Sequence, residues 1–290
     1  MNPARRFASW LGPAALLCLL LSTDRGLTAD RALWLRYPAI SPDGRTIAFE
    51  YRGNLWKVAA EGGVASPLTV GESYNSMPVW SPDGSKLAFA SDRNGNLDVY
   101  AMPADGGRAT RLTYHSADET PSSFTPDGKS VLFSAAVLDA PANAIVPNNA
   151  QPELYRVDLA GHMPEQVLTT PAVYAVYDRA MKRMLYSDQR GYEMEWRKHD
   201  QSAFARDVWL EDVGAKKFTR LTAYGVDDRQ PVWGPDEQSL FYLSEKSGSF
   251  NVWTMKLSDP EHATQVTSHK GSPVRFLSAS RAGDLCYAYD

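Results

Sequence analysis

Cysteine is nearly absent from this 290-residue sequence, which contains only Cys18 and Cys286. Cys18 lies within an apolar run from Leu11 to Leu21, which has the features of a cleaved export signal. Without that run the chain keeps Cys286 alone, so it can form no intramolecular disulfide even in an oxidising compartment. Its stability must therefore come from packing.

Long runs of like charge are also missing, because no five consecutive residues carry charges of one sign. The net charge is -4 and the pI is near 5.8, which gives no electrostatic basis for a nucleic-acid surface. We therefore exclude nucleic acid as a partner. The composition, 43% hydrophobic and 22% charged, is that of an ordinary globular protein.

Conventional catalytic motifs do not occur either. The sequence has no Gly-x-Ser-x-Gly elbow, no His-Glu-x-x-His pair and no phosphate-binding Gly-x-x-x-x-Gly-Lys-Ser/Thr loop. The five histidines are scattered without metal-ligand spacing, so we expect solvated loop residues. The sequence therefore predicts no catalytic residue, no metal site and no cofactor in this chain.

One stretch, Asp92 to Asp98, places oxygen-bearing side chains at alternate positions as a calcium loop does. It lacks the distal bidentate Glu and the loop length, and its Asn94-Gly95 pair favours a tight turn. We interpret it as a turn between two strands, with calcium binding as the alternative.

The N-terminal 29 residues differ from the rest of the chain. Arg5 and Arg6 precede the apolar run, and small residues from Gly26 to Ala29 precede a plausible cleavage point. We predict a signal peptide over residues 1–29 and an exported protein, either periplasmic or secreted, with no other membrane association. The alternative is an uncleaved N-terminal anchor, although the apolar run is short for a bilayer span.

What the sequence does contain is a repeat, seen most clearly from Pro78 to Thr113. This unit has two short strands joined by a Ser-Pro-Asp-Gly turn at Ser81–Gly84, a third strand at Asn96–Met102 and a last strand that ends in Leu112-Thr113. Such a unit is a four-stranded antiparallel meander, because each turn has residues suited to tight reversal. One unit alone could not bury its own face.

Copies of this unit cover the rest of the chain. The turn recurs at Asp43, Asp83, Asp127 and, in altered form, Asp236. The third-strand pattern occurs five times, and so does the closing pair, which is Leu-Thr in four copies and Val-Thr in the fifth. Units of this length with strand-like alternation are typical of a β-propeller. We predict an all-β fold over residues 30–290, with five complete blades and the first two strands of a sixth. A β-sandwich with accidental self-similarity is the alternative. An unfinished blade would expose a sheet edge, so we expect the natural chain to continue beyond Asp290.

Two insertions interrupt the repeat on one face of the predicted disc, at Val137–Gln151 in blade three and Asp188–Arg206 in blade four. Long loops on a rigid scaffold commonly carry binding surface. We predict that the second insertion contacts substrate through an aromatic and basic set, Tyr192, Trp196, Arg197, Lys198 and His199. The alternative is that Trp196 packs only within its own loop and the charges are solvated.

Several strings together resemble the N-terminal propeller of tricorn-type serine proteases, with secreted bacterial members as the nearest match. The resemblance covers Tyr37 to Asp290 and is carried by the strings Ser41–Phe49, Ser81–Phe89, Asn54–Val58, Trp196–His199, Ala205–Leu210 and Tyr242–Val252. The Pro-Asp-Gly repeats are shared with TolB and with prolyl-oligopeptidase-like propellers, so the blade-four and blade-five strings are the more specific.

This resemblance implies that the chain is part of a larger serine peptidase, with a second propeller, a PDZ domain and a catalytic core outside this sequence. The expected partners are peptides or unfolded polypeptide and those downstream domains, and the expected role is substrate gating or docking. No residue here matches the family's catalytic segments. The alternative is a TolB-like, non-enzymatic binding propeller of the cell envelope. It is less favoured because TolB-like proteins place a separate domain before the propeller, whereas about seven residues separate Ala29 from Tyr37 here.

Overall fold

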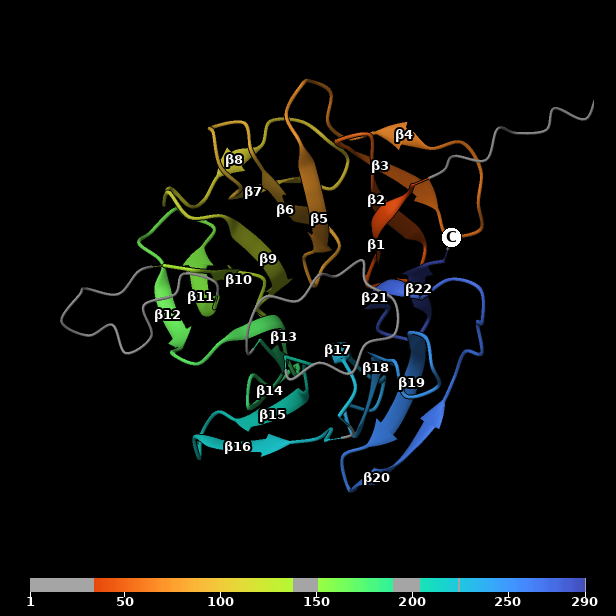
Figure 1. The fold of residues 1–290 in the computed structure, drawn as a ribbon. Helices are drawn as coiled ribbons and strands as arrows, with labels where there is room; N and C mark the ends of the chain where they lie inside the picture. The colour runs from red at the N-terminus through yellow and green to blue at the C-terminus, as the bar shows by residue number, and fades with distance from the viewer. Residues whose placement is uncertain (1–33, 138–150, 190–203, 224, 290) are drawn as a thin grey trace, which may run out of the picture. The chain divides into compact units, whose positions relative to one another are not determined.

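Six antiparallel sheets surround a common centre in the computed structural model, which describes residues 34–137, 151–189, 204–223 and 225–289 (Figure 1). Five sheets have four strands and the last has two. This arrangement confirms the predicted all-β propeller with five complete blades and two strands of a sixth. The predicted signal peptide lies outside the described residues and stays a prediction. In the ranges that are described, we find no helix with the length and hydropathy needed to cross a bilayer.

The blades are numbered in chain order. Blade one contains β1 (Arg36–Ile40), β2 (Thr46–Tyr51), β3 (Asn54–Ala59) and β4 (Ser66–Pro67). Blade two contains β5 (Asn75–Trp80), β6 (Lys86–Ser91), β7 (Asp98–Pro103) and β8 (Thr110–Arg111). Blade three contains β9 (Glu119–Phe124), β10 (Ser130–Ala135), β11 (Glu153–Asp158) and β12 (Glu165–Leu168). Blade four contains β13 (Ala172–Tyr177), β14 (Arg183–Asp188), β15 (Val208–Asp212) and β16 (Lys217–Arg220). Blade five contains β17 (Asp228–Trp233), β18 (Ser239–Ser244), β19 (Asn251–Lys256) and β20 (Asp259–Gln265), and blade six contains β21 (Arg275–Ala279) and β22 (Leu285–Ala288).

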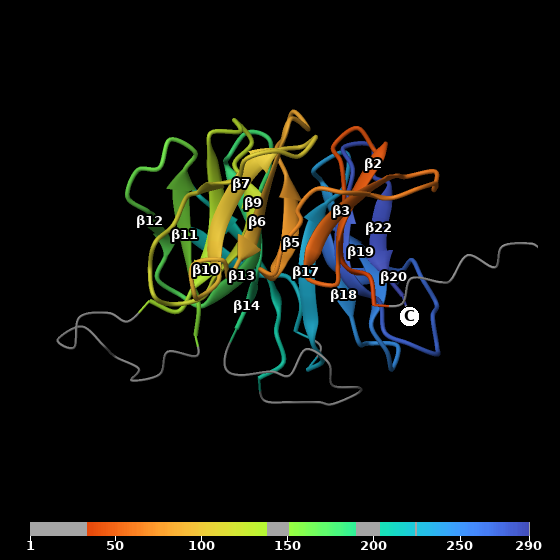
Figure 2. The ribbon, with the colours of Figure 1, turned by 90° about the horizontal axis from the view of Figure 1, so that it is seen from above.

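The two faces of the ring carry different connections (Figure 2). Within each complete blade the turns between the first and second strands and between the third and fourth strands lie on one face, which we call the turn face. The connections between the second and third strands, and those between blades, lie on the opposite face, which we call the loop face. The first strand of every blade is the one nearest the ring centre (Figure 1).

The Ser-Pro-Asp-Gly turn is closed by its own side chains. In blade two the Ser81 hydroxyl donates to Asp83 at 2.6 Å and accepts the Lys86 N–H at 2.9 Å, while the Gly84 N–H donates to the Ser81 carbonyl. Hydrogen bonds from Ser81 and from the Ser85 backbone hold the pKa of Asp83 well below its usual range. Gly84 has φ 72°, a left-handed conformation that glycine adopts without strain. This turn therefore forms wherever these four residues recur.

Blade four lacks that sequence and makes the same turn with one carboxylate. Asp178 accepts hydrogen bonds from the N–H groups of Lys182 and Arg183 at 2.8 and 3.1 Å. In blade two the two equivalent bonds are accepted by different residues, one by Asp83 and the other by Ser81. It also accepts the Arg183 side chain at 2.8 Å. Met181 occupies the position of glycine with φ 54°. The blade is therefore regular although its turn motif is absent from the sequence.

The blades are held together by apolar side chains packed between neighbouring sheets. Phe89 of blade two packs in one cluster with Leu55 and Leu68 of blade one, and Trp80 lies against the same cluster. The Trp80 indole donates to the Ala39 carbonyl at 2.8 Å, so it satisfies its polar atom across the blade boundary. Trp80 and Phe89 therefore pack between blades one and two.

Blade six closes the ring against blade one. The Ile40 N–H donates to the Ser278 hydroxyl at 3.1 Å, and the Arg281 N–H donates to the Pro42 carbonyl at 3.0 Å. The Tyr37 and Phe276 rings lie 4.3 Å apart between their centroids. Two strands are therefore enough to complete the inner wall of the ring.

Candidate functional site

A cavity of about 640 Å³ lies at the centre of the ring, on the turn-face side, and residues from the first strand of every blade line it. Its walls are mainly apolar and aromatic, with Trp80, Tyr174, Trp233 and Phe276 among the largest side chains. A cavity of this size, with apolar walls and few polar groups, is typical of ligand sites in proteins, roughly 300–1,000 Å³. It is the strongest candidate for a binding site in the described residues.

A bulge in each inner strand aims one side chain at this cavity. The pairing register shifts there in every blade, and in five blades the bulged residue has a left-handed φ of 50° to 57°. These five are Tyr37, Met77, Tyr174, Gln230 and Phe276. The equivalent residue of blade three is Pro121, whose ring fixes φ near −65°, so its strand shifts register without that conformation. All six side chains line the cavity.

The rim of the cavity on the turn face is formed by one position of the repeat, the second residue of each turn between the first and second strands. Four blades place proline there, and blades four and six place arginine: Pro42, Pro82, Pro126, Arg179, Pro235 and Arg281. The rim is therefore uncharged on one half and cationic on the other.

The two rim arginines differ in their contacts. Arg179 is 57% exposed, and its side chain forms an ion pair with Glu237 at 3.4 Å and donates a hydrogen bond to the Pro235 carbonyl at 3.4 Å. Glu237 also accepts the Arg179 backbone N–H at 3.0 Å. Arg281 is exposed, and its guanidinium has no hydrogen-bond or ion-pair partner in the part of the chain that the structure describes. The rim thus offers two cations to a ligand at the mouth of the cavity.

A second cavity, of about 500 Å³, lies on the loop face at blades three and four. Trp209, Tyr186 and Phe218 line it together with Gln151 and Gln189. Gln151 is the last residue of the first insertion that the sequence singles out, and Gln189 lies near the start of the second.

The predicted substrate-contact residues of the second insertion, Tyr192, Trp196, Arg197, Lys198 and His199, lie outside the described residues. Their role stays a prediction. The rim residues Arg179, Glu237 and Arg281 were not predicted from the sequence. The signal that could have found them is the alignment of the six turns, in which arginine twice replaces proline.

On the loop face, a threonine of the last strand or just after it fastens the third strand in four blades. The backbone N–H groups of Leu55, Val99, Val208 and Val252 each donate to a threonine hydroxyl at 2.9 Å, and the acceptors are Thr69, Thr113, Thr222 and Thr267. The residue before each donor is Asn54, Asp98, Asp207 or Asn251. We call each such group a clasp. It accounts for the threonine in four of the five closing pairs of the repeat.

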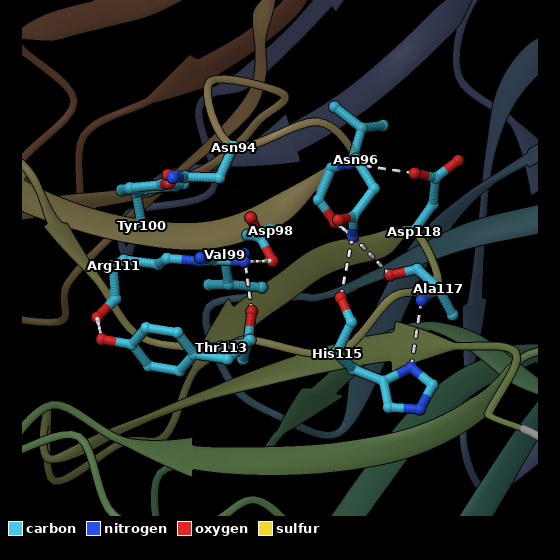
Figure 3. A network of polar contacts seen from close by, with 12 residues as sticks. Asn94, Asn96, Asp98, Val99, Tyr100, Arg111, Thr113, His115, Ala117 and Asp118 are labelled. Carbon is cyan, nitrogen blue, oxygen red and sulfur yellow. Dashed lines mark hydrogen bonds and ion pairs between the residues drawn. The ribbon is translucent and has the colours of Figure 1, made fainter.

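The clasps of blades two and four carry a charge that the others lack. Asp98 is matched by Arg111 at 2.8 Å (Figure 3), and Asp207 is matched by Arg220 at 2.7 Å. In the uncharged clasps the positions of these arginines are occupied by Pro67 and Gln265. Arginine is therefore present only where the clasp contains aspartate.

A buried acid from the next blade faces each charged clasp. Glu119 of blade three lies beside Thr113 and Asp98, and burial raises the pKa of Glu119 to about 7, with the Asp98 charge adding to the rise. Asp228 of blade five lies beside Thr222 and Asp207, and burial raises the pKa of Asp228 to about 7, with Asp207 and Asp227 adding to it. Ionising both of two close carboxylates in a buried site costs free energy, because the like charges repel and neither is well solvated. Glu119 and Asp228 therefore each take up a proton as the pH falls through about 7.

The stretch from Asp92 to Asp98 is a hairpin turn whose side chains bind other groups of the protein. Asp92 accepts the Tyr74 N–H at 2.7 Å, and Asn96 donates to the carbonyls of His115 and Ala117 at 3.0 and 2.9 Å (Figure 3). Asp98 is bound by Arg111. Within the described ranges no group of three or more His, Cys, Asp or Glu side chains is placed to hold a metal ion.

The fold and its cavity define a six-sheet β-propeller with an apolar central site on one face. Residues 32–290 match the family model of the tricorn protease N-terminal beta propeller domain, and the chain belongs to that family. The resemblance seen in the sequence is therefore confirmed.

Two curated relatives are peptidases of greater length. Tricorn protease homolog 1 of Streptomyces coelicolor is 28% identical over 234 residues, which cover 77% of this chain and 20% of that protein. The uncharacterized peptidase YuxL of Bacillus subtilis is 25% identical over 216 residues, which cover 71% of this chain and 28% of that protein. The chain thus spans less than a third of either relative.

Solved structures show the same fold. The crystal structure of the tricorn protease superposes with a TM-score of 0.72 at 20% identity, over 88% of this chain and 24% of that one. A putative TolB from Agrobacterium tumefaciens superposes with a TM-score of 0.67 at 16% identity, over 89% of this chain and 91% of that one.

Proposed function

We propose that the central cavity docks an extended peptide, and that the chain is the substrate-gating propeller of a longer, exported serine peptidase of the tricorn type. The groups that cleave the peptide then lie outside this chain. The single observation that carries the proposal is the apolar cavity that all six inner strands line. Membership of the tricorn propeller family and the peptidase relatives support the enzymatic context.

The walls of the cavity suit a peptide in two ways. Aromatic and aliphatic side chains can pack on apolar residues, and the bulged inner strands present backbone groups at the ring centre, where ladder pairing is interrupted. Backbone contacts recognise any sequence, so the site accepts varied peptides. This breadth is what a docking site for unfolded polypeptide requires.

Blocking the cavity tests this proposal. Ser122 lines it, and its hydroxyl has no hydrogen-bond partner among the described residues, so S122W fills space near the centre without removing a bond. We expect fluorescence anisotropy to show that the 290-residue chain binds labelled apolar peptides and that S122W binds them at least tenfold more weakly. The matched control is S116W, the same change at an exposed residue of the loop face. Equal binding by S122W and the unaltered chain would exclude the cavity as the docking site.

The absence of catalysis from this chain is tested separately. We expect the purified 290-residue chain to leave a peptide library uncleaved, as judged by mass spectrometry. Cleavage that a serine-directed inhibitor abolishes would contradict the assignment of the chemistry to other domains.

A non-enzymatic, TolB-like protein-binding propeller is the second candidate. It is favoured by the match to almost the whole of one putative TolB structure, a likeness in fold alone. A folded envelope protein would bind the outer surface of a face, so its affinity would be unchanged in S122W. Peptide binding that S122W abolishes therefore separates the two candidates.

A further inference from the structure

The charged half of the cavity rim is an arc across three consecutive blades. Arg179 comes from blade four, Glu237 from blade five and Arg281 from blade six, and all three line the cavity. The other half is formed by Pro42, Pro82 and Pro126, which carry no charge. A ligand at the mouth therefore meets cations on one side only.

The position of Arg179 is fixed by its neighbours in blade five. Its side chain forms an ion pair with Glu237 and donates to the Pro235 carbonyl, and its backbone N–H donates to Glu237. Glu237 stands where glycine is found in four other blades and has φ 52°. A left-handed backbone at a non-glycine residue is strained, and such residues cluster at functional sites. The strained residue Glu237 is thus also the residue that orients the rim arginine Arg179.

Arg281 differs because its guanidinium is not held by any described side chain, although its backbone N–H is fixed on the Pro42 carbonyl. One anchored cation and one free to move face the same mouth. Guanidinium groups match carboxylates in geometry and charge, and are less strongly hydrated than ammonium groups. The arc carries one net positive charge, since Glu237 offsets one of the two arginines.

We propose that this arc binds a carboxylate of a peptide whose apolar part enters the cavity, so that the propeller prefers peptides with an acidic group next to an apolar segment. The inference rests on the proposed function, because the cavity must first hold a peptide. The carboxylate can belong to an Asp or Glu side chain or to the peptide's C-terminus, and both present the same group to Arg179 and Arg281.

Three labelled peptides of equal length and equal apolar content distinguish these sources. The first has an uncharged sequence and an amidated C-terminus, the second has one Glu and an amidated C-terminus, and the third is uncharged with a free C-terminal carboxylate. We expect the 290-residue chain to bind the second or third peptide about threefold to tenfold more tightly than the first at low salt. The preference should shrink in high salt, because the rim is exposed.

Variants of the rim then locate the preference. R179Q and R281Q keep the backbone N–H groups, and each should reduce the ratio of acidic-peptide to uncharged-peptide affinity about threefold, the size expected for exposed ion pairs. The matched control is R45Q, which removes an exposed arginine of the turn face that does not line the cavity.

The outcomes separate this inference from the proposed function. Equal affinity for all three peptides, or a preference that R179Q and R281Q leave intact, would overturn the carboxylate site and leave peptide docking in place. A failure of all three peptides to bind would overturn both.

Discussion

On both the loop face and the turn face of the propeller, some blades place a charged residue where the others have an uncharged one. The two faces differ in whether the protein pairs that charge with an opposite one. On the loop face, aspartate replaces asparagine in two clasps, and each new carboxylate is paired with an arginine that the other clasps lack. On the turn face, arginine replaces proline at two rim positions. One of these cations is held by Glu237, whose backbone is strained, and by the Pro235 carbonyl, and the other has no described partner.

This difference separates structural from functional variation within one chain. A buried charge must be neutralised by its own protein, because desolvation is costly, so a change at one position of a clasp requires a second change. An exposed charge has no such requirement, since water solvates it. Cations kept at the mouth of a cavity without full compensation are therefore available to a ligand.

The largest effect is expected from breaking a charged clasp. R111A leaves Asp98, which is fully buried, without its cation, and we expect a loss of about 3 kcal/mol in the free energy of unfolding. Urea denaturation measures it. The double variant D98N/R111Q copies the residues of blade five and should recover most of this loss.

The control for that experiment is R156A, which removes a surface cation paired with Glu165. We expect it to cost less than about 1 kcal/mol. If D98N/R111Q were no more stable than R111A, the pairing of arginine with aspartate would not explain the two kinds of clasp.

The next effect is a pH dependence of the charged clasps. Burial raises the pKa of Glu119 in the folded chain to about 7, above its unfolded value near 4.5. The folded state then binds the proton more tightly, so the stability from this group is greatest below pH 4.5 and is lost as the pH rises toward 7. Because E119Q removes the titration, its advantage over the unaltered chain should grow by about 2 kcal/mol between pH 5 and pH 8.

Thermal or urea unfolding at the two pH values checks this result, with E61Q, a change at an exposed glutamate, as the control. An advantage of E119Q that is the same at pH 5 and pH 8 would show that Glu119 does not hold a proton in the folded state.

The smallest effect concerns backbone strain on the turn face. E237G and E237A both remove the carboxylate that Arg179 contacts, but only glycine relieves the left-handed φ of 52°. We expect E237G to be more stable than E237A by about 1 kcal/mol, less whatever flexibility glycine adds to the unfolded chain. Equal stabilities would remove the argument that blade five accepts strain in order to orient Arg179.

Most of the fold could be predicted from the sequence, because the residues that recur in each repeat are those that form its turns and strand contacts. The second strand of blade two follows the predicted turn at Ser81–Gly84 and spans Lys86–Ser91, where every residue after Lys86 is buried. Its first strand begins earlier than predicted, at Asn75, since Asn75 and Ser76 are polar residues buried at the blade boundary.

The candidate site was harder to predict, for a physical reason. The altered turns of blades four and six look like weakened motifs in the sequence, and only the closed ring brings Arg179 and Arg281 to one rim. The bulges that aim Tyr37 and Phe276 at the cavity depend on backbone conformation and leave no motif. The sequence analysis placed the substrate contact in a long loop instead, because the length of a loop can be read from the sequence alone.

The central claim is that peptide binds in the cavity on the turn face. Photo-crosslinking tests it most directly, with an apolar peptide that carries a benzophenone group and with mass spectrometry to locate the attachment sites on the 290-residue chain. We expect attachment to inner-strand residues of several blades, such as Met77, Tyr174 and Phe276, which line the cavity. Attachment confined to the loop face, for example at Trp209 or Phe218, would contradict it.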